Sequence, residues 1–118
     1  MSRAESYFNG HKFVNNLGSE CIFKFENGLI TGTYTTAVSA NGGGQIPNKE
    51  IHGSYTEVED GVLLNFNIQW GQSQTVWCGK LYFDQDEFRM NWLLNRNKPL
   101  NQEWEATSVG QDKFHRAE

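Results

Sequence analysis

Residues 62–70 of the chain read VLLNFNIQW, and this stretch decides the fold class. Apolar side chains alternate with polar ones along it, and Leu63 is the one exception. A period of two residues is that of a β-strand with one face against a core and the other toward water. Residues 88–94 and 21–25 repeat the alternation. We therefore predict a protein built from half-buried strands.

Tight-turn signals separate runs of this kind. Asn27-Gly28 and Asp60-Gly61 are dipeptides typical of hairpins, and residues 84–86 form a further polar turn. About eight runs follow one another, near residues 12–16, 20–26, 29–38, 49–56, 62–70, 75–83, 87–94 and 106–115. No segment has a convincing helical period over three turns. The pattern predicts an all-β fold, an eight-stranded antiparallel up-and-down β-barrel without exposed edges.

Composition agrees with a single domain over residues 1–118, with the barrel at about 11–116. Hydrophobic residues make up 37% of the chain and charged residues 20%, and the formal net charge is −4. There is no basic patch for nucleic acid, and no apolar run approaches the roughly 18 residues that cross a membrane. The first six residues lack the apolar stretch of a signal peptide, which leaves open an intracellular protein or one whose signal has been removed.

The cysteines and histidines do not form the pattern of a metal, redox or catalytic site. Cys21 and Cys78 lie far apart, without CxxC spacing or a neighbouring His, so we expect neither a metal site nor a redox motif. We interpret both as small buried or half-buried thiols, and a disulfide between them stays open. His11, His52 and His115 are scattered, and no nucleophile–base pair is visible. We therefore expect no enzyme, no metal and no cofactor.

Several polar side chains share the inward face of their predicted strands. A single Ser, Thr or Asn at a strand end usually bonds to backbone, but this group occurs together with four Trp residues. Unpaired buried polar groups cost roughly 1–3 kcal/mol each, so they need one another, water or a ligand. Apolar, aromatic pockets with a few placed polar groups typically bind small molecules. The set that predicts such a pocket is Asn15, Ser19, Tyr34, Thr36, Ser73, Thr75 and Asp112.

Six motifs, in order and at near-matching spacing, make this chain resemble the avidin–streptavidin family. They are residues 13–19 (FVNNLGS), 29–38 (LITGTYTTAV), 73–79 (SQTVWCG), 92–94 (WLL), Trp104 and residues 109–114 (VGQDKF). The resemblance runs from about residue 11 to residue 115. Streptavidin is itself a standard example of an eight-stranded barrel that holds one small ligand. The resemblance therefore implies the same barrel as the strand pattern.

The resemblance implies high-affinity, non-catalytic binding of biotin, with sequestration of this vitamin as a biological role. Asn15, Ser19 and Tyr34 would donate hydrogen bonds to the ureido oxygen of biotin, much as an oxyanion hole does. Asp112 and Thr36 would accept from the two ureido N–H groups, and the charge of Asp112 would strengthen its bond. Secretion follows only by analogy with the family.

The remaining implied contacts surround the ring and tail of biotin. Thr75 would meet the ring sulfur. The valerate carboxylate would meet Ser73 and the loop residues Val38, Ser39 and Ala40, and the bicyclic ring would lie among Trp70, Trp77, Trp92 and Leu94. Trp104 would reach the pocket of a neighbouring subunit, which implies a homotetramer or homodimer.

Two loops and one core position depart from the family pattern. The loop from Trp70 to Ser73 contains only two residues, and the loop after Val38 is longer and carries Gly42-Gly43-Gly44. Phe13 stands where the family usually has Trp, which we interpret as a packing change at the barrel end. Ordering a flexible loop costs entropy, so we expect faster ligand release than in the tightest relatives. The altered loops leave open a barrel of the same fold adapted to another small ligand or a peptide.

Overall fold

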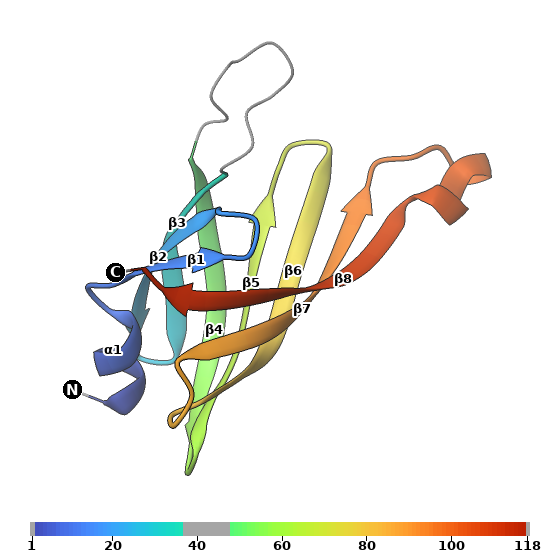
Figure 1. Ribbon diagram of the computed structural model, residues 1–118. Helices are drawn as coiled ribbons and strands as arrows, with labels where there is room; N and C mark the ends of the chain where they lie inside the picture. Colours follow the sequence, from blue (N-terminus) through green and yellow to red (C-terminus); the bar gives the residue numbers. More distant parts are fainter. Residues whose placement is uncertain (1, 37–47, 118) are drawn as a thin grey trace.

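The computed structural model describes residues 2–36 and 48–117, and its strands close into one barrel (Figure 1). Each strand pairs antiparallel with the next, and the last strand returns to pair with the first. The predicted eight-stranded up-and-down barrel is confirmed. The strands are β1 (Lys12–Asn15), β2 (Glu20–Glu26), β3 (Leu29–Thr35), β4 (Lys49–Val58), β5 (Gly61–Gln69), β6 (Ser73–Tyr82), β7 (Glu87–Arg96) and β8 (Thr107–Arg116).

Strand β5 follows the alternation that its sequence predicts. Val62, Leu64, Phe66 and Ile68 are at most 2% exposed, whereas Leu63 is 48% exposed. The inward side chains of β5 therefore form part of the barrel core.

Two tight hairpins set the register of their strands. In the β2–β3 hairpin Asn27 has φ 53° and Gly28 has φ 82°, which matches the mirror-image turn that Asn-Gly favours. In the β5–β6 hairpin the N–H of Trp70 bonds to the carbonyl of Ser73 at 2.8 Å, and Gly71 has φ 113°. Because this loop closes so tightly, β6 begins at Ser73, two residues before the predicted run.

Two short helices were not predicted from the sequence. Helix α1 (Arg3–Phe8) lies against the end of the barrel beside β2, and the 3-10 helix η1 (Leu100–Glu105) follows β7 (Figure 1). Ser2 caps α1, because its Oγ accepts from the N–H of Glu5 and the Glu5 side chain accepts from the N–H of Ser2. This Ser-x-x-Glu capping box is the one sequence signal that could have located α1.

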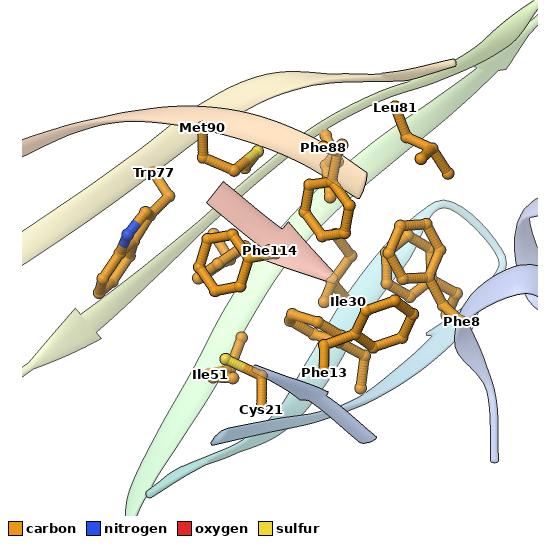
Figure 2. Packing of buried hydrophobic residues seen from close by; sticks show 14 of the residues in the cluster. Phe8, Phe13, Cys21, Ile30, Ile51, Trp77, Leu81, Phe88, Met90 and Phe114 are labelled. Carbon is orange, nitrogen blue, oxygen red and sulfur yellow. The ribbon is translucent and has the colours of Figure 1, made fainter. Parts of the chain in front are cut away.

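Helix α1 plugs one end of the barrel with an aromatic side chain. Phe8 is fully buried, and its ring stacks on that of Phe25 with centroids 4.0 Å apart. Asn9 ties the helix to β2, donating to the carbonyl of Phe25 and accepting from its N–H. Phe13 is also fully buried against Phe8, in a core that continues through Phe88 (Figure 2). The expected packing change at Phe13 thus falls at this plugged end.

The two cysteines lie on opposite sides of the barrel wall. Cys21 is fully buried in the core, whereas Cys78 faces outward from β6 and is exposed. Both thiols are free, so the disulfide left open by the sequence is not formed. The expectation that both are buried or half-buried is wrong for Cys78, because its position in β6 has the outward parity of Val76. Burial, and secondarily the charge of Asp112, raises the pKa of the Cys21 thiol far above its usual range.

Candidate functional site

In the described part of the chain, the buried polar side chains are Asn15, Ser19, Thr75 and Asp112. They are between 3% and 8% exposed. All four belong to the set that strand parity predicted to face inward. They come from β1, the residue before β2, β6 and β8, so closure of the barrel brings together side chains that are distant in sequence.

Asn15 holds the turn between β1 and β2 and presents an amide group to the interior. Its Oδ1 accepts from the backbone N–H groups of Leu17 at 3.1 Å and Ser19 at 3.0 Å. Its Nδ2 donates to the hydroxyl oxygen of Tyr34 at 3.3 Å, and the Ser19 side chain also bonds to Tyr34. Because two N–H groups hold the amide oxygen, the NH₂ group is oriented toward the interior. Three potential donors thus lie together.

Tyr34 keeps its proton in this environment. Burial is the main cause that raises the pKa of the Tyr34 phenol, and the nearby Cys21 and Asp112 raise it further. Hydrogen bonds with Ser19 and Asn15 act in the opposite direction. A raised pKa keeps the phenol neutral well beyond physiological pH. Tyr34 therefore retains an O–H that can donate to a ligand.

Asp112 places an acceptor beside these donors, because its strand β8 pairs with β1 and Asn15 stands opposite Phe114 in that register. One of its oxygens, Oδ2, accepts from the indole Nε1 of Trp77 at 2.9 Å, and both residues are buried. None of the ion pairs formed by described residues includes Asp112. A buried carboxylate without a cation depends on N–H and O–H donors for its stabilisation. The site therefore favours a ligand that brings further N–H groups.

Aromatic side chains form the walls between these polar groups. The Tyr34 ring lies 5.6 Å from the rings of both Trp70 and Trp77. Trp70 donates from its indole N–H to the Thr75 hydroxyl at 2.8 Å. A hydroxyl that accepts one bond can still donate its own proton, so Thr75 can also bond to a ligand.

Trp92 lies across Gly110 of the neighbouring strand. A Cβ atom at Gly110 would stand 2.3 Å from the Trp92 ring, so a larger residue could not occupy this position without moving the indole. In the sheet register Trp92 pairs with both Trp77 and Gly110. Glycine in the VGQDKF motif thus allows a flat indole wall between β6 and β8.

These residues surround a cavity of about 190 Å³. Strand parity or the family resemblance predicted all of the lining residues except Leu17. Leu17 lies in the turn after β1 and is 68% exposed, so strand parity carried no signal for it. The lining consists of Asn15, Leu17, Tyr34, Thr75, Trp77, Trp92, Leu94 and Asp112.

The other predicted site residues lie around this cavity or away from it. Ser19 is buried and bonds to Tyr34. Thr36, Trp70 and Ser73 are half-buried, at the ends of β3, β5 and β6. Ser73 lines a separate groove of about 550 Å³ at the rim. The predicted contacts of Val38, Ser39 and Ala40 fall outside the described residues.

Trp104 does not cover the cavity of its own barrel. It lies in η1, at the end of an arm that β7 and β8 carry away from the barrel (Figure 1). The side chain is 80% exposed. Trp104 is accordingly not among the residues that line the cavity of its own barrel.

Metal and membrane sites are not apparent in residues 2–36 and 48–117. No group of three or more His, Cys, Asp and Glu side chains there could hold a metal ion. Neither of the helices in these ranges has the length and apolar character that a membrane crossing requires.

Comparisons with known proteins agree with this geometry. The chicken (Gallus gallus) avidin-related protein 4/5 is 32% identical over 113 residues, covering 89% of this chain and 75% of the relative. The crystal structure of xenavidin matches with a TM-score of 0.78 and 29% identity, over 91% of this chain and 95% of the other. The X-ray structure of a biotin binding protein from chicken matches with a TM-score of 0.81 and 28% identity, over 97% and 98% of the two chains.

A family model decides the classification. The model of the avidin family matches residues 4–117, nearly the whole chain, and includes the barrel and all of helix α1 except Arg3. With that match and the avidin-related relatives, the chain belongs to the avidin family.

Proposed function

We propose that this protein binds biotin in the barrel cavity and holds it without turnover. The observation that carries the proposal is the clustering of buried polar side chains, with three tryptophans nearby, around one cavity of about 190 Å³. The avidin family consists of binding proteins that are not enzymes, and this chain is a member. Binding without turnover would withdraw biotin from its surroundings, so we also propose a sequestering role.

The ureido group of biotin complements the hydrogen-bond donors and acceptors of the cavity. It has one carbonyl oxygen that accepts and two N–H groups that donate. Asn15, Ser19 and Tyr34 supply donors for the oxygen, and the Asp112 carboxylate supplies a charged acceptor for one N–H. Thr36, at the end of β3, accepts from the other N–H in this proposal. A preorganised donor cluster polarises the ureido carbonyl. This polarisation strengthens the hydrogen bond from the ureido N–H to Asp112.

The apolar part of biotin fits the aromatic walls. The bicyclic ring would lie among Trp70, Trp77, Trp92 and Leu94, with its sulfur toward the Thr75 hydroxyl. Burial of apolar surface contributes roughly 25 cal/mol per Å², so these walls provide much of the binding free energy. Because the walls are already packed, little ordering of the barrel is required.

We infer that the protein also assembles with copies of itself, as a homotetramer or homodimer. An exposed indole on a projecting arm, Trp104, is suited to cover the pocket of a neighbour. The outer face of β6 to β8 carries Val76, Leu93 and Val109, which are 43%, 46% and 71% exposed. Apolar side chains that remain exposed together are typical of an interface between subunits.

Calorimetric titration of the purified chain with biotin tests the proposal. We expect saturation near one biotin per chain. Lipoic acid is the matched control ligand, because it has a pentanoate tail and a sulfur ring but lacks the ureido group, and we expect no binding. Recovery of unchanged biotin after denaturation checks that no turnover occurs. No heat and no thermal stabilisation with biotin would overturn the proposal and indicate that the altered loops select another ligand.

A further inference from the structure

Arg96 occupies the outermost inward position of β7. The side chains of Trp92, Leu94 and Arg96 alternate along the same face of this strand, and the first two line the cavity. In the sheet register Leu94 pairs with Thr75, and Arg96 pairs with Ser73. Two residues of a strand span about 7 Å, so Arg96 and Ser73 form the next layer toward the mouth of the barrel.

The contacts of Arg96 confirm that its guanidinium lies on the inner face. Its Nη1 donates to the Oγ of Ser108 at 2.9 Å. Ser108 has the same parity in β8 as Gly110, beneath Trp92, and Asp112, in the cavity lining. A second, longer bond of 3.5 Å reaches the backbone carbonyl of Glu105. The Arg96 side chain therefore links the end of β7 to the start of β8, near the mouth of the barrel.

The backbone at Arg96 is fixed by the short β5–β6 loop. The N–H of Asn97 bonds to the carbonyl of Gln72 at 2.8 Å, and the Asn97 side chain bonds to that of Gln72 at 2.7 Å. The N–H of Arg96 itself bonds to the carbonyl of Ala106 at 2.7 Å. Hydrogen bonds to Gln72 and to Ala106 thus fix the backbone from which the Arg96 side chain extends.

The charge of Arg96 is not neutralised by a described carboxylate. Among the described residues it forms no ion pair, and both of its acceptors are neutral oxygens. Its charged neighbours are Lys98, which pairs with Glu105 at 3.7 Å, and Glu103, which lines the same rim groove. A guanidinium has five N–H donors in a fork that fits a carboxylate. Arg96 can therefore bind an anionic group at the mouth while it retains its bond to Ser108.

We propose that Arg96 binds the carboxylate at the end of the ligand tail, so that the site prefers free biotin to its uncharged amide. This inference rests on the proposed function, because it requires the ureido head to occupy the cavity. A cavity of about 190 Å³ is smaller than the roughly 300 Å³ at which ligand pockets usually begin, so a chain attached to the head extends toward the mouth. There it meets Arg96 and Ser73 together.

Competition binding with biotin and biotinamide tests the inference, since the two ligands share the head and differ in the charge of the tail. In the unaltered protein we expect biotin to bind roughly tenfold more tightly than biotinamide, as for a charge-assisted bond that is partly exposed. Arg96→Gln should reduce this ratio to about threefold or less, mainly by weakening biotin. Arg96→Lys should retain most of the preference because it keeps the charge. The matched control is Arg89→Gln, which removes the same charge from the outward face of β7.

The outcomes separate this inference from the proposed function. If both ligands bind with the same ratio in the unaltered protein and in Arg96→Gln, the role of Arg96 is refuted and biotin binding stands. If Arg89→Gln lowers the ratio as much as Arg96→Gln, the effect is one of net charge and the inference is also refuted. Failure of the unaltered protein to bind either ligand overturns the proposed function and the inference together.

Discussion

Replacing Asp112 by Asn should weaken biotin binding by at least tenfold while leaving the barrel intact. Asn has nearly the shape of Asp, and its single oxygen can still accept from the Trp77 indole, which donates to Asp112 at 2.9 Å in this structure. The amide NH₂ group would then occupy the place of the second carboxylate oxygen. There it would face the ureido N–H, so that two donors meet and neither is satisfied.

The magnitude follows from the burial of the pair. A hydrogen bond to a charged group contributes about 1.5–3 kcal/mol, so its loss alone weakens binding by roughly ten- to 150-fold. The opposed donors add to this loss. The free energy of unfolding of Asp112→Asn should change by less than about 1 kcal/mol, because the hydrogen bond from Trp77 survives and a buried charge is removed. In Asp112→Ala the Trp77 N–H has no acceptor, and the unfolding free energy should fall by about 1–3 kcal/mol as well.

Calorimetric titration with biotin and urea unfolding without ligand measure the two quantities separately. Asp84→Asn is the control, because Asp84 lies exposed in the turn between β6 and β7 and away from the cavity. Biotin affinity within threefold of the unaltered protein in Asp112→Asn would refute the assigned role of this carboxylate. A large loss of stability in the same variant would instead show that the Trp77 bond requires the charge.

The remaining predictions concern the plug, the core thiol and the assembly. Phe8→Ala should lower the unfolding free energy by about 3–5 kcal/mol in urea, because Phe8 is fully buried and stacks on Phe25; a loss below about 1 kcal/mol would show that the plug is dispensable. Cys21 should react with a thiol reagent only after unfolding, since burial raises its pKa and excludes the reagent, and mass spectrometry of the native, labelled protein would reveal any earlier reaction. Trp104→Lys should weaken biotin binding and reduce the assembly size measured by light scattering; a variant unchanged in both would contradict the donation of Trp104 to a neighbour.

Periodicity alone was sufficient for the strands but not for the helices. In β5 every second side chain enters one core, so the alternation in residues 62–70 records the fold directly. Helix α1 has only six residues, fewer than two turns, and it buries just Ala4 and Phe8. A pattern that short is not distinguishable from a loop. Its capping box at Ser2 and Glu5 was the stronger signal, because capping depends on spacing and not on period.

Site residues could be predicted where a strand directs the side chain into the barrel. They could not be predicted where a loop or a second chain sets the position of the side chain. Parity in β1, β6 and β8 identified Asn15, Thr75 and Asp112, because a closed sheet forces all inward positions toward one axis. Parity does not specify depth, and for that reason Ser73 was grouped with the cavity although it lines the rim. The exposure of Trp104 at 80% depends on the arm that carries it, and no local pattern encodes the direction of that arm.

The three polar–aromatic hydrogen bonds at the cavity orient the polar side chains that the proposed ligand would contact. Asn15 bonds to Tyr34, Thr75 to Trp70 and Asp112 to Trp77, and each bond joins a polar group to an aromatic wall. Each of these polar groups thereby has at least one partner within the barrel, which reduces the penalty of burying it. The same bonds fix the directions of the donors and acceptors that a ureido group would require, so binding need not order them again. We therefore expect affinity differences from relatives to arise at the mouth, where the two loops depart from the family pattern, and not in the cavity itself.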